Sequence, residues 1–246
     1  MIDTHAHILK EYYDDIDALV IELKKKKVRA IINNSTNIKE AKEVLEYSKK
    51  YRNFLYPAIG IHPENIDDAN IDELETLINN NKIVAIGEIG LDYHWTKDNK
   101  EKQKELFIKQ LELSLKYNLP VIVHTRDSIQ DCLDIIKKYN LKGIMHCFSG
   151  SYEMAKEFIK YGFKLGIGGV LTFKNSKLYE VINKINLDDI VLETDSPYLS
   201  PEPFRGQKNN PSNMLYIAKR IAEIKGITID EVIEKTTENA RNIFDI

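Results

Sequence analysis

Short apolar runs recur along the chain, and amphipathic stretches separate them. Runs of this kind are typical of strands buried on both faces of a parallel sheet. The pattern predicts eight strands, at Ile2–His7, Val28–Asn33, Phe54–His62, Ile83–Asp92, Val121–His124, Ile144–Phe148, Phe163–Gly168 and Ile190–Asp195.

The stretches between these runs place apolar residues at helical spacing. Strands that alternate with helices predict a parallel sheet with the helices outside, and eight such units in 246 residues favour a closed (β/α)₈ TIM barrel over an open doubly wound sheet. No linker or shift in composition divides residues 1–246, so we expect one domain with closing helices at its C-terminal end. The expected helices are Tyr12–Leu23, Ile38–Lys50, Ile71–Asn80, a long helix capped by Asp98 and running through Leu115, Ser128–Tyr139, Tyr152–Tyr161, Leu178–Ile185 and, after a proline-rich loop at Ser196–Pro211, Asn213–Lys225 and Ile229–Lys235 with a last turn at Asn239–Phe244.

Composition narrows the class of protein. The net charge of −3 argues against a broadly basic surface that coats duplex DNA, but it leaves room for a nucleic acid gripped locally. Cys132 and Cys147 lie in apolar surroundings, which favours reduced, buried thiols over a disulfide. We see neither a secretory leader nor an apolar run long enough to span a membrane. We therefore expect a cytoplasmic protein, and a monomer by default.

The chemistry-bearing residues gather at the predicted strand ends. In a (β/α)₈ barrel the active site is built at the carboxyl ends of the strands. Taken singly, a strand-end histidine is often a satisfied core side chain, and an isolated His-x-His is often a pair of surface histidines. Five of the six histidines nevertheless end a strand, together with two carboxylates, and this joint occurrence favours a site. The strand-end residues are His5, His7, Asn33, His62, Glu88, His124, His146, Gly168 and Asp195.

Imidazole nitrogens and carboxylate oxygens together suit divalent ions such as Zn²⁺, Mn²⁺ or Mg²⁺. Six ligands are too many for one tetrahedral ion with an open position, and they fit two. Two such ions activate a water for in-line displacement, and Asp195 is placed to take its proton. We assign His5, His7 and Asp195 to one ion, His124 and His146 to the other, and Glu88 as the bridge between them.

Six motifs carry a resemblance to a known family. Met-Ile-Asp-Thr-His-Ala-His (1–7), Gly-Ile-His-Pro (60–63), Gly-Glu-Ile-Gly-Leu-Asp-Tyr (87–93), Val-Ile-Val-His (121–124), His-Cys-Phe-Ser-Gly (146–150) and Glu-Thr-Asp-Ser-Pro-Tyr-Leu (193–199) occur in this order over almost the whole chain. They resemble the TatD family of metal-dependent deoxyribonucleases. The resemblance implies a TIM barrel with a two-metal centre that hydrolyses DNA, commonly as a 3′-to-5′ exonuclease on single strands. The family's ligand positions fall on the same six residues, His5, His7, Glu88, His124, His146 and Asp195.

The chain departs from the family in one loop. Where the family usually reads Arg-Gly-Lys-Arg-Asn-Glu-Pro, this chain has Gln207 in place of a basic residue and Asn210 in place of the glutamate. If the loop supports the metals or grips phosphate, the change alters metal preference or affinity. All six ligand positions are kept, so we expect the activity to persist.

Further residues suggest contacts with the substrate. His62 is interpreted as a phosphate or leaving-group contact, with a hydrogen bond to a ligand as the alternative. Arg126, Arg205 and Lys208 are candidate phosphate contacts, because cationic side chains match phosphate oxygens; the alternative for each is a plain surface ion pair. For Trp95 the sequence favours packing against the barrel rim over stacking on a nucleobase, and Asp92 either orients a ligand histidine or caps its loop.

Two other classes of function compete with the nuclease. An amidohydrolase that cuts an amide or ester, such as an aminoacyl-tRNA deacylase, uses similar ligands, but Glu88 stands where such enzymes often carry a carboxylated lysine. The third class is a non-catalytic binding protein on the same scaffold, and the complete ligand set disfavours it. The sequence therefore predicts a two-metal DNA phosphodiesterase.

Overall fold

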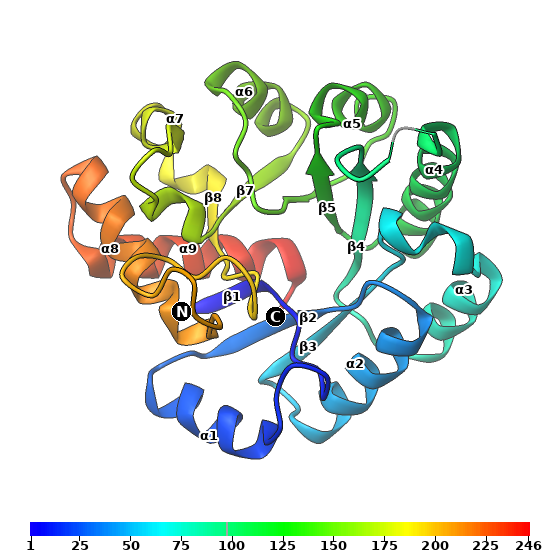
Figure 1. Cartoon of the computed structure of the whole chain (residues 1–246), viewed down its shortest axis with the longest axis horizontal. Helices are drawn as coiled ribbons and strands as arrows, with labels where there is room; N and C mark the ends of the chain where they lie inside the picture. The colour runs from blue at the N-terminus through cyan, green and yellow to red at the C-terminus, as the bar shows by residue number, and fades with distance from the viewer. Residues whose placement is uncertain (97) are drawn as a thin grey trace.

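A barrel of eight parallel strands forms the centre of the molecule, in a computed structural model that describes residues 1–96 and 98–246 (Figure 1). Neighbours in the sheet follow the chain order from β1 to β8, and every pair is parallel. The predicted (β/α)₈ barrel is confirmed. The strands are β1 (Ile2–Ala6), β2 (Ala30–Asn34), β3 (Leu55–Ile59), β4 (Ala85–Asp92), β5 (Val121–Arg126), β6 (Gly143–Met145), β7 (Phe163–Ile167) and β8 (Ile190–Leu192).

The last and the first strand close the barrel through backbone contacts beyond β8. Ala6 and Ser196 form a parallel bridge. Asp195 N–H donates to the His5 carbonyl at 2.9 Å, and His7 N–H donates to the Ser196 carbonyl at 2.8 Å. The closure therefore lies at the residues that the sequence nominated for the site.

Helices surround the barrel and cover the outer faces of the strands (Figure 1). Four short 3₁₀ segments lie between them: η1 (Pro63–Asp68), η2 (Gly169–Thr172), η3 (Leu187–Asp189) and η4 (Pro211–Asn213). The α-helices are α1 (Ile16–Lys25), α2 (Ile38–Lys50), α3 (Ile71–Asn80), α4 (Lys100–Tyr117), α5 (Ile129–Ile136), α6 (Tyr152–Lys160), α7 (Leu178–Lys184), α8 (Met214–Lys225) and α9 (Ile229–Phe244).

Four predicted helix boundaries were wrong, one of them the end of the helix expected over Ser128–Tyr139, which stops at Ile136 as α5. The first helix begins at Ile16 because the Asp15 side chain caps it, accepting from Ala18 N–H at 2.8 Å. The long helix follows Asn99, which makes no side-chain cap, and Asp98 is not its cap. The C-terminal helix runs unbroken from Ile229 to Phe244.

The polar stretch within α9 stays helical because tertiary contacts hold it. Its Asn239 side chain donates to the Leu187 and Ile190 carbonyls at 2.8 and 2.7 Å, just before and at the start of β8. A capping box between Thr228 and Glu231 begins the helix.

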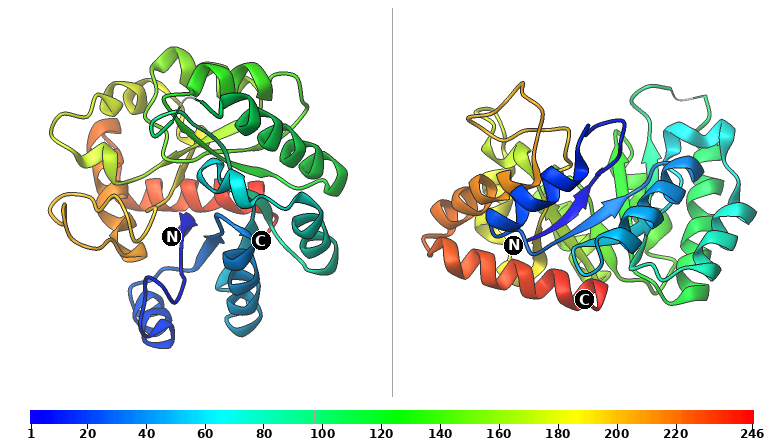
Figure 2. Two further views of the ribbon diagram at one scale, coloured as in Figure 1. Left: turned by 45° about the vertical axis from the view of Figure 1, so that its right-hand side comes forward. Right: turned by 90° about the horizontal axis from the view of Figure 1, so that it is seen from below.

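Apolar side chains fill the barrel interior, and α9 closes its amino-terminal end. Inward-pointing residues include Ile32, Ile122 and Ile144, and they pack with Ile243 and Phe244 of α9. In Figure 2 (right) α9 lies along one end of the barrel, while the long loop after β8 lies at the opposite end. This apolar plug leaves the carboxyl ends of the strands as the place for polar chemistry.

Both cysteines are free thiols, as expected; Cys132 is buried and Cys147 is half-buried. Among the helices of residues 1–96 and 98–246, none combines the length and the apolar character that crossing a membrane requires.

Candidate metal centre

Side chains from six strand ends converge at the open end of the barrel. His124 and His146 follow the inward residues Ile122 and Ile144 by two positions, so strand alternation points them into the barrel. His146 and Asp195 lie just beyond the last residues of β6 and β8, and backbone hydrogen bonds to the neighbouring strands still hold them: His146 N–H donates to the Val123 carbonyl and Asp195 N–H to the His5 carbonyl, each at 2.9 Å. The convergence follows from the strand-end positions that the sequence showed.

Two irregularities in strand pairing bring in the remaining residues. Ile2 and Ala85 point inward, and His5 and Glu88 each follow by three positions, which an unbroken alternation would send outward. The register shifts between Asp3 and Ala6 in β1 and between Ile86 and Ile89 in β4. Each shift re-aims the strand, as a β-bulge does.

Glu88 stands at the centre of the cluster, and each of its carboxylate oxygens faces a different set of imidazoles. Oε2 lies 3.4 Å from His5 Nε2 and 3.6 Å from His7 Nε2. Oε1 lies 3.0 Å from His124 Nδ1 and 3.7 Å from His146 Nε2. This division is the geometry expected of a carboxylate between two ions.

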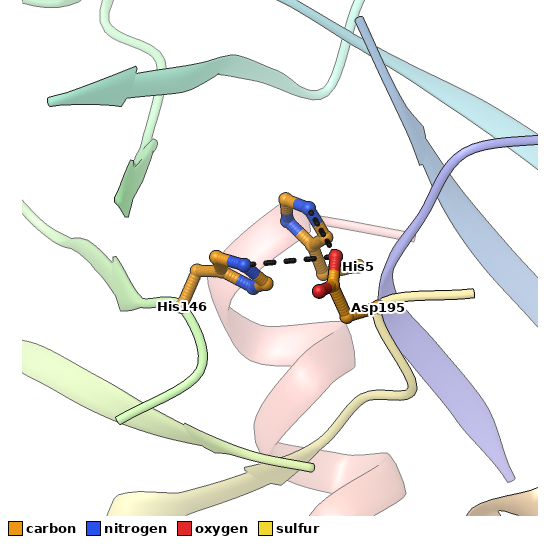
Figure 3. A group of neighbouring side chains, drawn as sticks. All are labelled: His5, His146 and Asp195. Atoms are coloured by element: carbon orange, nitrogen blue, oxygen red, sulfur yellow. Dashed lines mark ion pairs between the residues drawn. The ribbon is translucent and has the colours of Figure 1, made fainter. Parts of the chain in front are cut away.

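Asp195 completes the set from the β8 side. Its Oδ1 lies 3.6 Å from His5 Nε2, 3.7 Å from His7 Nε2 and 3.8 Å from His146 Nε2. Figure 3 shows the His5 and His146 rings side by side, both directed at this carboxylate, and the two rings stack with centroids 3.5 Å apart. His146 thus packs against His5 and Asp195, which the sequence assigned to the other ion, and its ring centre lies 6.3 Å from that of His124.

The far nitrogen of three of the histidines meets an acceptor. His7 Nδ1 donates to the Asn34 carbonyl at 3.2 Å, His124 Nε2 faces Asp92 Oδ2 at 3.0 Å, and His146 Nδ1 faces Glu193 Oε1 at 3.0 Å. A proton held on the outer nitrogen leaves the inner nitrogen's lone pair directed at the cluster. This is the arrangement by which proteins present neutral histidines to a metal.

The spacing of the inner atoms fits a divalent ion. Four ligands at 2.0–2.2 Å from a tetrahedral ion lie about 3.3–3.6 Å from one another. The distances from the inner nitrogens of His5 and His7 to each other and to the Glu88 and Asp195 oxygens run from 3.1 to 3.7 Å. The two imidazole nitrogens are buried, and each also lies within 3.7 Å of the Glu88 and Asp195 carboxylates. The donor set therefore fits a metal.

Burial and charge together set the pKa values. Burial lowers the pKa of His146, but Glu193 and then Glu88 raise it to about 10 overall. Burial likewise lowers the pKa of His124, and Asp92 with Glu88 raises it to about 9. Burial raises the pKa of Glu88, yet the surrounding imidazoles hold it well below the usual value. The carboxylates are thus charged at neutral pH, and a cation is the natural complement.

His62 is close to the cluster but carries its proton on the inner side. Glu64 N–H donates to His62 Nδ1 at 3.2 Å, so a neutral imidazole holds its own proton on Nε2. That nitrogen lies 3.6 Å from Glu88 Oε1. Burial, followed by the charge on His124, lowers the pKa of His62 to about 3. His62 therefore presents a neutral N–H donor to the site.

The cationic residues that the sequence suggested are all exposed: Arg126 ends β5, and Arg205 and Lys208 lie on the loop after β8. Each lies over an aromatic ring: Arg126 Cζ is 5.2 Å from the Trp95 ring centre, Arg205 Cζ is 4.2 Å from that of Phe173, and Lys208 Nζ is 4.3 Å from that of Tyr13. Within residues 1–96 and 98–246, none of the three cations forms an ion pair.

Sequence reasoning missed Glu193 and left Asp92 undecided. Glu193 is fully buried; its Oε1 accepts from Cys147 N–H at 2.7 Å, and Oε2 has no hydrogen-bond partner among the described residues. A buried acid two residues before a strand-end aspartate is the signal that could have revealed it. Asp92 faces His124 and accepts from His94 N–H at 2.8 Å, so it both orients a histidine and caps its loop.

Hydrogen bonds within its own turn and to the segment after β8 hold the loop in which the chain departs from the family. The Asn210 side chain accepts from Ser212 N–H at 2.9 Å and caps η4. The neighbouring Asn209 donates to the Thr194 and Tyr198 carbonyls at 2.8 and 2.7 Å. Gln207 is exposed. Asn210 therefore serves the loop's own fold.

Comparison with known proteins gives consistent matches along the chain. The family model of TatD related DNases matches residues 2–245. The chain is 42% identical to the uncharacterized metal-dependent hydrolase YabD of Bacillus subtilis, over 100% of this chain and 99% of that protein. It is 31% identical to the human deoxyribonuclease TATDN3, over 99% of this chain and 94% of that protein. The solved structure of YJJV, a TatD homolog of Escherichia coli, superposes with a TM-score of 0.93 at 31% identity, covering 100% and 98% of the two chains.

Proposed function

The chain belongs to the TatD family of metal-dependent hydrolases, and from that premise we propose that it hydrolyses phosphodiester bonds of single-stranded DNA from the 3′ end. The observation that carries the proposal is the placement of Glu88, whose two oxygens face separate groups of imidazoles in the mouth of the barrel. A bridging carboxylate suits the two-ion arrangement that phosphodiester hydrolysis favours.

We assign the holding of two divalent ions to six residues of this chain. His5, His7 and Asp195 would hold one ion, His124 and His146 the other, with Glu88 available to both and Mg²⁺, Mn²⁺ or Zn²⁺ as candidates. Bound there, the ions would supply Lewis-acid activation of a water and of the phosphoryl oxygens. Asn34, Asp92 and Glu193 fix the histidines from behind.

Asp195 is the residue we propose to move the proton. Its Oδ1 faces the imidazoles, and its side chain keeps 14% of its surface open toward the mouth. Burial raises the pKa of Asp195, but the neighbouring imidazoles, His7 first among them, lower it below the usual value. Asp195 is therefore charged at neutral pH, as a general base must be. In this proposal its Oδ2 takes the proton of the attacking water and returns it to the leaving oxygen.

His62 and the cations at the rim complete the substrate contacts in this proposal. The His62 Nε2–H is directed toward the centre of the cluster, where it would donate to a phosphate or leaving oxygen. Arg126, Arg205 and Lys208 would bind phosphates of the flanking strand, because exposed cations without an acidic partner keep their charge available.

The test is incubation of metal-loaded protein with end-labelled single-stranded DNA. We expect a ladder of nucleotides released from the 3′ end, abolished by chelation and by the Glu88→Ala and Asp195→Asn variants. Release that does not need metal, or equal release by both variants, would refute the proposal. Hydrolysis of an aminoacyl-tRNA by the wild type alone would instead favour the amidohydrolase class. The single domain, monomeric state and cytoplasmic location stay predictions from the sequence.

A further inference from the structure

The one tryptophan of the chain stands exposed at the mouth of the barrel. Trp95 follows the end of β4, the strand that carries Glu88. Its exposed fraction is 68%, although burying a large apolar side chain is worth about 1.5–3 kcal/mol. The expected packing against the barrel rim is therefore wrong, and the indole presents its surface to solvent.

Neighbouring side chains hold the indole in a defined position. The Arg126 guanidinium lies over the ring, 5.2 Å from its centre. The His94 ring meets the indole edge-on at 4.9 Å, and His94 Nδ1 lies 3.2 Å from Asp127 Oδ2. Because these contacts restrict the ring, a ligand that stacks on it need not order it first.

The Trp95 indole and the Arg126 guanidinium lie beside the metal-binding cluster. Arg126 follows His124 by two positions on β5, so both side chains leave the strand on the same side, about 6.6 Å apart along it. Asp92 pairs with Arg126 in the β4–β5 ladder, and Tyr93 N–H donates to the Arg126 carbonyl at 2.9 Å. The pair is thus anchored to the two strands that carry Glu88 and His124.

We propose that Trp95 and Arg126 form a nucleobase-binding subsite, which receives one base of a single-stranded substrate next to the scissile bond. The base stacks on the open surface of the indole, and the guanidinium holds the adjoining phosphate. A base inside a duplex already stacks on both sides and offers no free face, so the subsite selects unpaired strands. This inference rests on the proposed function and adds how the metal-binding site would recognise a single-stranded substrate.

The first test uses Trp95 itself as the probe. Because it is the only tryptophan, its emission reports on this position alone. The metal-loaded wild type is titrated with a cleavage-resistant phosphorothioate oligothymidylate, and separately with an abasic oligonucleotide of equal length and charge. Quenching by the base-bearing strand and not by the abasic one supports stacking. Unchanged emission with both strands, or equal quenching by both, overturns the subsite.

The second test measures affinity and kinetics. By fluorescence anisotropy of a labelled oligonucleotide, Trp95→Ala is expected to bind about 5- to 150-fold more weakly, the equivalent of ~1–3 kcal/mol for one stacked base. Trp95→Phe keeps most of the affinity because the ring remains. KM rises in Trp95→Ala while kcat stays within about twofold, since the ring positions substrate and does no chemistry. Tyr179→Ala, which removes an exposed aromatic from α7, is the matched control and behaves as the wild type.

The outcomes separate this subsite from the proposed function. Cleavage of single-stranded DNA by the wild type, with equal affinity in Trp95→Ala, refutes the subsite and leaves the nuclease standing. A metal-loaded wild type that neither binds nor cuts DNA refutes both.

Discussion

Replacing Glu193 by glutamine removes one negative charge from behind the metal-binding cluster and changes almost no volume. Glu193 Oε1 lies 3.0 Å from His146 Nδ1 and accepts from Cys147 N–H at 2.7 Å. Glutamine can still accept from Cys147, but it no longer carries the charge that holds the outer proton of His146. We therefore expect His146 to lose its fixed orientation while the fold persists.

The expected magnitude follows from the role of Glu193. Loss of an outer partner of a metal-binding histidine weakens metal affinity by about 10- to 100-fold, or ~1.4–2.7 kcal/mol. Isothermal titration of the metal-free protein with Mn²⁺ measures this directly. Activity at saturating metal should recover to within a few-fold of the wild type, because Glu193 touches no substrate. Burial lowers the pKa of His146 and Glu193 raises it, so the variant also brings that pKa down from about 10, which NMR titration of the metal-free protein detects.

Glu234→Gln is the matched control, since Glu234 is exposed on α9 at the far end of the barrel. A Glu193→Gln variant with wild-type metal affinity and an unchanged His146 pKa would refute the reasoning. Loss of activity that saturating metal does not restore would also refute it.

Four further predictions concern packing, proton release, pH-dependent stability and helix capping. A Cβ at Gly166 would lie 2.1 Å from Glu193 Oε2, whereas one at Gly168 meets nothing closer than 3.6 Å. In urea unfolding we expect Gly166→Ala to lower the free energy of unfolding by about 1–3 kcal/mol and Gly168→Ala to lower it by less than about 0.5 kcal/mol. Equal losses in the two variants would contradict this account. Because the pKa values of His124 and His146 are raised to about 9 and about 10 in the metal-free protein, metal uptake at pH 7 should release about two protons, measured by calorimetry in buffers of different ionisation enthalpy. The pairing of protonated His124 and His146 with their acidic neighbours stabilises the metal-free fold fully below the ordinary histidine pKa, about 6.5. This contribution is lost as the pH rises through 9 to 10, so a melting temperature that increases over this range would count against the prediction. Thr228→Ala removes the capping box of α9 and should cost about 1 kcal/mol of stability, with metal affinity unchanged.

The barrel and most of its site could be predicted from the sequence because both depend on periodicity. Apolar runs alternating with amphipathic stretches specify strands and covering helices. Side chains two positions apart on a strand point to the same face, so His124 points into the barrel like Ile122, and His146 like Ile144. The helix start at Asp15 and the unbroken course of α9 were harder to predict from the sequence. A local cap decides the first, and the contacts of Asn239 with the start of β8 decide the second.

Tertiary structure alone decided how His5 and Glu88 reach the cluster. Both lie three positions after an inward residue, and a regular strand would turn them toward the helices. The register shifts in β1 and β4 reverse that direction. A shift of this kind depends on the pairing of neighbouring strands, which no local pattern encodes.

The protonation of the histidines was also beyond the sequence. The outer partners of His7, His146 and His62 lie 27, 47 and 2 residues away along the chain, at Asn34, Glu193 and Glu64. The first two leave the inner nitrogen free to bind a metal, and the third places a proton on it. The sequence by itself determined which residue types meet at the open end of the barrel. The folded chain decided which of them present a lone pair and which a proton, because the polar partner that the fold brings to each outer nitrogen selects the tautomer.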